Sequence, residues 1–185
     1  MRFNARLLVD IFYEPDCAGK MHLFMGILDE GTHLHVCPLV KARDQATLWD
    51  ALLESWFTPF GPPEALLLDK EGGLDSTFFA DKCSDLGVQV RMIPADAHFQ
   101  AGKIESQNYA LKRILRKTID QSQCVGPEMM KVAAIFACQA KNSLVRRSGV
   151  SAHMHAFGRE VRLPGALLSD PDNPELHSRI DKDTD

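Results

Sequence analysis

The sequence of 185 residues lacks several features that would assign it to a specialised class of protein. It has no apolar run of the roughly 18–20 residues that a membrane helix needs. No long apolar stretch near the N-terminus has the character of a signal peptide. It also shows no internal repeat and no low-complexity segment. We therefore expect one intracellular globular domain with no membrane partner.

Paired cysteines are also absent. The five cysteines are scattered and odd in number, and none of them shows Cys-x-x-Cys spacing: Cys17, Cys37, Cys83, Cys124 and Cys138. This pattern argues against a disulfide framework and against a zinc ribbon. We expect reduced thiols with a structural role.

An overall excess of positive charge, which is common in nucleic-acid-binding proteins, is missing as well. The net charge is -4 at pH 7, and residues 169–185 account for all of it, so residues 1–168 are net neutral. A local basic cluster does occur, made of Lys112, Arg113, Arg116 and Lys117. A local cluster matters more than the total charge when the partner is a phosphate backbone.

The pattern of apolar residues predicts three strands, followed by an alternation of helices and strands. The expected strands are residues 6–12, 21–28, 33–41, 64–68 and 88–93, and the expected helices are 44–60, 76–86, 103–121 and 127–147, with a loop over 94–101. An antiparallel start followed by alternating elements indicates an α/β fold, in which helices flank a five-stranded mixed sheet. We expect this domain to cover residues 1–164, and the acidic tail over 165–185 to be irregular.

Three acidic residues stand out by their positions. Asp10 lies inside the first apolar strand, Asp69 ends the fourth strand, and Glu105 lies in the first turn of the third helix. Each acid alone has a structural explanation, such as a strand end, a turn or the helix dipole. If the three converge, their carboxylates repel one another unless cations bind, and all-oxygen ligands favour Mg²⁺ or Mn²⁺. The set therefore indicates a site for two such ions, which would support phosphoryl transfer.

The order and spacing of these acids resemble the D,D-35-E arrangement of retroviral and LTR-retrotransposon integrases, because 35 residues lie between Asp69 and Glu105. The segment from His98 to Glu105 is similar to the His-x-Gln-x-Gly-x-x-Glu segment of this family. Residues 56–63, and the segment from Asn142 to Pro164, are also similar to retrotransposon members. The resemblance spans roughly residues 6–164.

The resemblance implies an RNase H-like fold and an integrase catalytic core over residues 1–164. It implies that Asp10, Asp69 and Glu105 are the catalytic residues and bind two Mg²⁺ (or Mn²⁺) ions. The reaction would be DNA 3′-end processing followed by strand transfer, with element ends and target DNA as partners. A homodimer or higher oligomer and a nuclear location would also be expected.

Six further residues are candidates for contacts with DNA: His98, Gln100, Lys103, Tyr109, Lys112 and Arg116. The last three follow Glu105 at helical spacing and share one face, which would align an aromatic ring and two cations with a DNA backbone. An ordinary solvated basic face is the alternative. By the resemblance, the first two would form a loop that grips DNA.

Two histidines alternate along the third predicted strand, at positions 33 and 35. A metal site with two histidine ligands is one interpretation. A pair of surface histidines is the interpretation we expect.

Two other functions remain open. The first is an integrase-derived domain that has lost its chemistry and binds nucleic acid or acts as a scaffold. The net neutral charge of residues 1–168 favours this function. The residues that follow Asp69 and Glu105, which are Lys70 and Ser106, favour it as well. The second is an RNase H-like nuclease acting on RNA–DNA hybrids, which usually has more acids in a different order.

Overall fold

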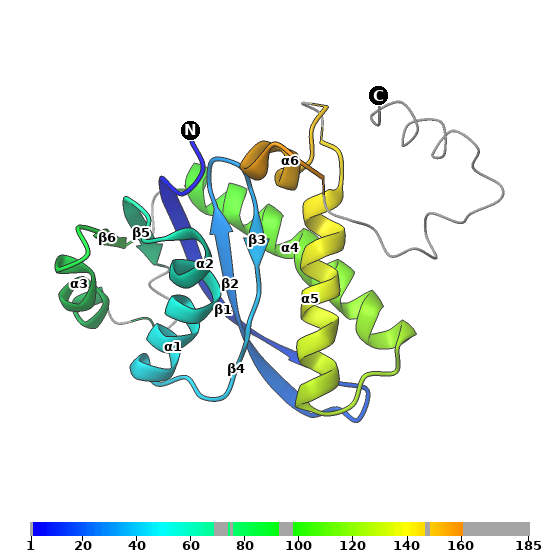
Figure 1. The fold of residues 1–185 in the computed structure, drawn as a ribbon. Helices are drawn as coiled ribbons and strands as arrows, with labels where there is room; N and C mark the ends of the chain where they lie inside the picture. Colours follow the sequence, from blue (N-terminus) through cyan, green and yellow to red (C-terminus); the bar gives the residue numbers. More distant parts are fainter. Residues whose placement is uncertain (1, 69–73, 75, 93–97, 147–148, 161–185) are drawn as a thin grey trace.

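The computed structural model describes residues 2–68, 74, 76–92, 98–146 and 149–160, with only the backbone described at 76 and 98–105. One sheet runs through the molecule (Figure 1). Its strands are β1 (Arg6–Pro15), β2 (Met21–Asp29), β3 (His35–Val36), β4 (Leu39–Val40), β5 (Ala65–Leu68) and β6 (Gln89–Met92). The order is β3-β2-β1-β5-β6, with β4 also paired to β2. The pairing of β1 with β2 is antiparallel, and those of β1 with β5 and of β5 with β6 are parallel, so the predicted mixed sheet is confirmed.

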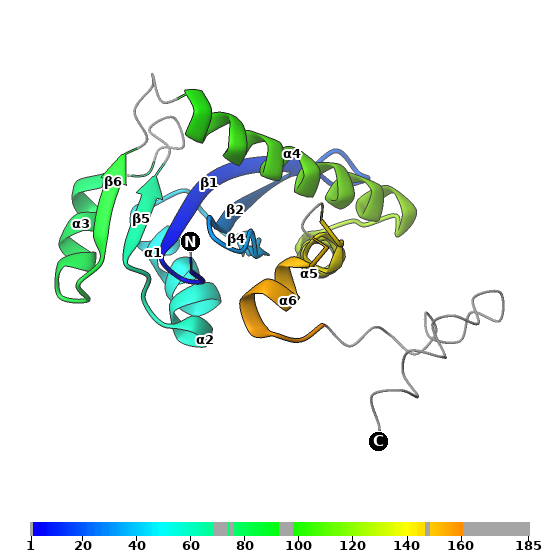
Figure 2. The same ribbon diagram turned by 90° about the horizontal axis from the view of Figure 1, so that it is seen from above.

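Helices cover both faces of this sheet. Their bounds are α1 (Gln45–Leu52), which continues through the π-helical turn η1 (Leu53–Phe57) into α2 (Thr58–Phe60), then α3 (Ser76–Ser84), α4 (His98–Gln121), α5 (Pro127–Ser143) and α6 (Ala152–Phe157). Seen from above, α4 lies across one face and α1, α2 and α3 lie on the other, while α5 stands beside β4 (Figure 2) and β3 (Figure 1). Within the described residues, no helix combines the length and apolar character needed to cross a membrane.

The alternation of side chains along β1 divides the core in two. Leu7 and Val9 belong to the cluster that includes Trp56 and Phe79, from η1 and α3. Phe12 belongs to a second cluster, formed with side chains of α4 and α5. Asp10 is two residues before Phe12, so its side chain is on the α4 face of the sheet. The alternation of side chains along β1 therefore places Asp10, a predicted site residue, opposite α4.

The predicted elements differ from the structure in several bounds, and three of these differences are the largest. The expected strand 33–41 is two short strands, because Pro38, which lies between them, has no amide hydrogen for the ladder. The helix expected from residue 103 begins at His98, so residues 98–101 are helical and not a loop. The helix expected to reach residue 147 ends at Ser143.

Helix α6 was not predicted. Ser151 forms its N-cap by accepting a hydrogen bond from the Met154 amide at 3.0 Å. The fully buried Ser151 hydroxyl also lies 2.8 Å from both carboxylate oxygens of Glu160. A helix of six residues has too short an apolar pattern to identify from periodicity.

The outer edge of β3 is covered by a side chain of α5. The Asn142 side chain accepts a hydrogen bond from the His35 amide at 2.9 Å and donates one to the His35 carbonyl at 2.8 Å. Asn142 and His35 are both buried. The amide group therefore takes the place of a neighbouring strand, which attaches α5 to the sheet and blocks this part of an exposed edge.

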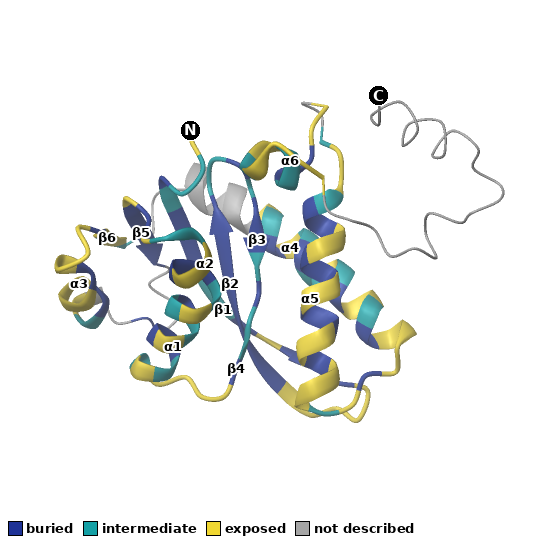
Figure 3. Ribbon diagram, viewed as in Figure 1, coloured by how far each residue is buried: buried dark blue, intermediate teal, exposed yellow. Residues whose placement is uncertain are grey.

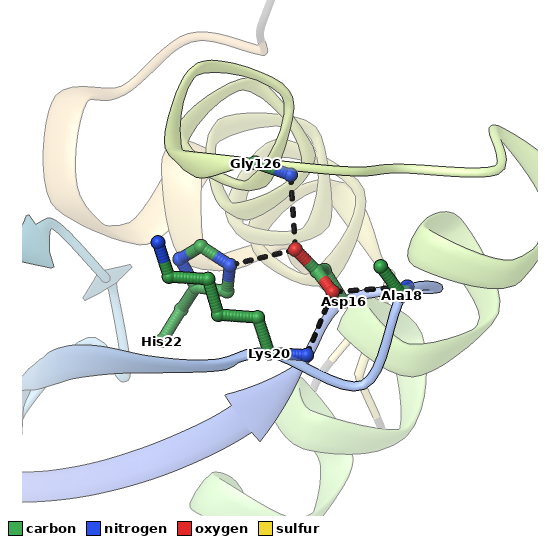
Figure 4. A network of polar contacts seen from close by, with 5 residues as sticks. All are labelled: Asp16, Ala18, Lys20, His22 and Gly126. Atoms are coloured by element: carbon green, nitrogen blue, oxygen red, sulfur yellow. Dashed lines mark hydrogen bonds and ion pairs between the residues drawn. The ribbon is translucent and has the colours of Figure 1, made fainter.

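The β1–β2 turn is attached to the start of α5 through Asp16 (Figure 4). One carboxylate oxygen accepts hydrogen bonds from the amides of Ala18 and Lys20, and the other from the Gly126 amide at 2.9 Å. His22 Nε2 lies 2.9 Å from that second oxygen. These hydrogen bonds, that of Gly126 first and that of His22 next, hold the pKa of Asp16 well below its usual range.

We expect Asp16→Asn to lower the urea midpoint of unfolding at pH 7, because an amide group replaces one acceptor oxygen with a donor. Because the pKa of Asp16 is lowered in the native state, its contribution is fully present above the unfolded-state pKa of about 3.9 and is lost progressively as the pH falls from that value toward the lowered native-state pKa. The difference between the midpoints of wild type and variant should therefore be largest at pH 7 and should shrink steadily as the pH falls below about 4. Tryptophan fluorescence in urea at each pH measures this.

The matched control is Asp50→Asn, since Asp50 is an exposed acid on α1. It should leave the midpoint unchanged at every pH. A gap between Asp16→Asn and wild type that stays constant down to pH 3 would show that the carboxylate charge is not the source of the stabilisation.

Candidate functional site

Asp10 lies in the middle of the sheet, on a strand with a neighbour on each side. It is paired with Gly26 of β2, and the preceding residue Val9 is paired with Leu68 of β5. One carboxylate oxygen of Asp10 accepts a hydrogen bond from the Ile11 amide at 2.7 Å, and the other accepts one from the Asn108 side chain at 2.8 Å. The Asp10 carboxylate is therefore half-buried and held against α4.

The other two predicted metal ligands fall largely outside the described residues. Asp69 is not described, although it follows Leu68, the last residue of β5. Glu105 is in α4, three residues before Asn108, and only its backbone is described. Among the side chains that the structure does describe, no three His, Cys, Asp or Glu groups form a metal site. The three-acid site stays a prediction.

Gly26 leaves the space that Asn108 and His35 occupy beside Asp10. A Cβ atom at position 26 would lie 3.3 Å from His35 Nε2 and 3.7 Å from Asn108 Oδ1. The first distance is tighter than ordinary van der Waals contact, so a larger residue at this position would displace the His35 ring. Both side chains thus lie on the same face of the sheet as Asp10.

The prediction that His33 and His35 both lie on the surface is wrong for His35. Its side chain is fully buried, and neither ring nitrogen has a hydrogen-bond partner among the described residues. Burial first, and the charge of Lys141 second, lower the pKa of His35 well below its usual range, so the ring is neutral. His33 is half-buried and adopts a positive φ of 61° in the turn before β3. Spacing along the strand could not show that a glycine opposite makes room for one ring.

Three polar residues of α4 meet three alternate residues of β1. Asn108 contacts Asp10, the Lys112 ammonium lies 4.4 Å above the centroid of the Phe12 ring, and Arg116 donates to both oxygens of Glu14. The Arg116 distances are 2.7 and 2.9 Å, and Glu14 is buried while the Arg116 side chain is 61% exposed. The hydrogen bonds and charge of Glu14 raise the pKa of Arg116.

These contacts change the interpretation of the basic face. Lys112 and Arg116 lie on the same side of α4, and their partners in the structure are Phe12 and Glu14 of the same chain, so their contacts with DNA stay predictions. Tyr109 is 64% exposed. The side chains of the other three predicted contacts are not described, although their backbone belongs to α4: His98, Gln100 and Lys103.

Asn108 is a site residue that the sequence analysis missed. It follows Glu105 by three residues, so helical periodicity puts both residues on one side of α4. This spacing was the available signal. The partner strand was not predictable from spacing alone, because the contact joins residues 98 positions apart.

No protein-family model matches the sequence, and a search of curated proteins also returns no match. Solved structures do match. The HTLV-2 integrase catalytic core domain in complex with magnesium has a TM-score of 0.70 at 16% identity in its trimeric form, over 85% of this chain and 99% of that one. The dimeric form of the same domain has a TM-score of 0.68 at 15% identity, over 84% of this chain and 97% of that one.

An integrase chain also matches from the simian T-cell lymphotropic virus intasome in complex with PP2A regulatory subunit B56 gamma. Its TM-score is 0.70 at 17% identity, over 89% of this chain and 58% of that one. At such identities a structural likeness establishes the fold. The chain therefore shares the fold of these retroviral integrase catalytic core domains, which is the RNase H-like fold that the family resemblance implies.

Proposed function

We propose that this chain is a catalytic core that cuts and joins DNA by metal-dependent phosphoryl transfer, with Asp10, Asp69 and Glu105 as ligands of two Mg²⁺ (or Mn²⁺) ions. The observation that carries the proposal is the hydrogen bond from Asn108 to Asp10, because it fixes this carboxylate against the helix that contains Glu105. The pairing of Val9 with Leu68, the residue before Asp69, supports the approach of the second acid.

The chemistry around Asp10 fits a hard cation. A carboxylate oxygen accepts more than one contact, so the bonds from Asn108 and the Ile11 amide orient Asp10 without excluding coordination. Outer-shell hydrogen bonds of this kind are common around metal ligands. Bound metal ions would stabilise the attacking and leaving oxygens of the phosphoryl group. The role of the protein is to hold the three acids and the DNA in register.

The matched structures support magnesium and DNA as the partners of this chain. The HTLV-2 core was solved with magnesium, and the simian virus chain belongs to an intasome. We extend magnesium and DNA binding to this chain by analogy. Tyr109 is an exposed candidate for a DNA contact on α4 that, among the described residues, pairs with no acid of the sheet in the way Arg116 does. His98, Gln100 and Lys103 stay candidates because they belong to the same helix, toward its start.

One observation favours the second candidate function, an integrase-derived domain without chemistry. The two cations predicted to line up with DNA, Lys112 and Arg116, both interact with β1. A cation that pairs with a buried acid contributes less to a phosphate contact than a free one. An active core needs the metal ligands, whereas a scaffold needs only the fold, so activity assays separate the two.

We expect the protein to join oligonucleotides carrying element ends to target DNA in Mg²⁺ or Mn²⁺. Asp69→Asn and Glu105→Gln should abolish this strand transfer while leaving the melting temperature without metal equal or higher, since each removes one of three clustered charges. Gel assays of strand transfer and thermal melting measure both effects. An unfolded variant would show that the acids are structural, and equal activity would exclude them from the site.

Asn108→Ala should weaken the apparent Mg²⁺ affinity of strand transfer by about 10–100-fold, the usual effect of losing an outer-shell partner of a metal ligand. Excess Mg²⁺ should restore much of the rate, which is the mark of a positioning residue. Ser106→Ala, an exposed polar position on the same helix, is the matched control and should keep the wild-type metal requirement. An unchanged Mg²⁺ dependence in Asn108→Ala would contradict the role given to Asn108.

Self-association is proposed from a second surface. Met129, Val132 and Phe136 repeat at helical spacing on α5 and are 43%, 48% and 52% exposed. Exposed residues follow the outer side of this helix in Figure 3. A contiguous apolar patch on a helix indicates a protein contact. We propose a homodimer through this outer face of α5.

Val132→Asp should weaken the dimer at least about tenfold, because it puts an unpaired charge into an apolar interface. Sedimentation over a range of protein concentrations measures the dissociation constant. Ala80→Asp is the matched control, since it also adds a negative charge at an exposed position but lies on another helix, α3. Equal dimerisation of the two variants would place the interface elsewhere.

A further inference from the structure

A groove of about 490 Å³ runs along the β3–β4 edge of the sheet. Its floor is the edge itself, from Leu34 to Leu39, and its walls come from α5 on one side and from α1, η1 and α2 on the other. At the β3 end it is closed by His153 and Phe157 of α6. Ile135 and Phe157 line the groove yet are 48% and 41% exposed. Large apolar surfaces of this kind are normally covered.

The described chain ends at this groove. Glu160 lies three residues after the end of α6, next to the Ser151 hydroxyl that caps the start of this helix, and near His153, which lines the groove. The next eight residues, 161–168, are Val-Arg-Leu-Pro-Gly-Ala-Leu-Leu. When extended they span about 26–29 Å. Apart from Arg162 this segment is apolar, and Pro164 followed by a glycine disfavours a helix.

A basic pocket of about 370 Å³ continues from the far end of the groove. Leu39 lines both, and the second pocket also includes Lys20, Lys41 and Arg43. Figure 1 shows α6 near the β3 end of the sheet edge and β4 toward the opposite end. Beyond residue 168 the sequence becomes acidic, with Asp170, Asp172 and Glu175. The apolar-then-acidic order of the tail therefore matches the apolar-then-basic order of the surface.

We propose that residues 161–168 bind in the groove of their own chain, and that the acidic residues after them reach the basic pocket. The match of order and charge favours this occupant over a second copy, whose α5 stripe would present only apolar groups. Tethering at Glu160 adds to this, because a short linker gives an effective concentration of about millimolar. The docked segment would cover Ile135 and Phe157.

The occupant would be recognised mainly by its side chains. At His35 the outward backbone groups of the edge are already bound by Asn142, and Pro38 has no amide to offer. Strand addition is thus blocked at these two positions. Pockets for Leu163, Leu167 and Leu168 would then provide the specificity.

Hydrogen–deuterium exchange of the full chain, read by mass spectrometry, tests the proposal. The amides of residues 161–168 should exchange at least about tenfold more slowly than an unstructured chain. Ile135→Asp, which charges the groove, should remove this protection. Val132→Asp is the matched control: it is equally exposed on the same helix but does not line the groove, and protection should persist.

Protein concentration distinguishes the occupants. Protection that is equal at low and high concentration, and that disappears only in Ile135→Asp, is the expected result. Exchange of residues 161–168 at the unstructured rate at every concentration would overturn the proposal. Protection that appears only as dimer forms, and that Val132→Asp removes, would assign the groove to a second copy and also overturn it. Strand transfer does not enter these outcomes, so the result is independent of the proposed function.

Discussion

The contact between α4 and β1 sets the position of the candidate site. Four residues of a helix rise about 6.0 Å, and two residues of a strand rise about 6.6 Å. Because these lengths nearly match, residues 108, 112 and 116 of α4 can each meet one of residues 10, 12 and 14 of β1. The helix cannot slide along the strand without breaking all three contacts. The orientation of Asp10 depends on this register.

The three contacts differ in strength, and the difference has consequences. Glu14 is buried, and a buried carboxylate is costly unless a cation pairs with it. Arg116 supplies two charge-assisted hydrogen bonds, which is the geometry best suited to that need. Lys112 lies over Phe12, which also stacks on Phe24 in the core. The basic face of α4 is therefore part of the fold, and a DNA partner would meet it with some of its charge already engaged.

Much of the fold could be predicted from the sequence. The buried strands and long helices have clear periodicity, and the neighbours of Asp10 follow from the antiparallel start and the parallel crossover. The residues that were missed or misjudged depend on contacts distant in sequence. His35 is buried because Gly26 leaves room for it, and Asn142 covers the edge of β3 from a helix more than 100 residues away. Asp16 similarly joins its turn to Gly126. No local pattern carries such information.

The candidate site was predicted in part. Its position inside an apolar strand identified Asp10, and the structure orients its carboxylate with Asn108, which no sequence pattern had connected to it. Whether Asp69 and Glu105 complete a metal site is the central claim. Thermal melting of wild type and Asp10→Asn across a titration of Mg²⁺ and Mn²⁺ tests it most directly, since a ligand of the native state raises the melting temperature by mass action. A metal-dependent rise that disappears in the variant is the predicted result. An equal rise in both proteins, or none at millimolar metal with DNA present, would contradict it.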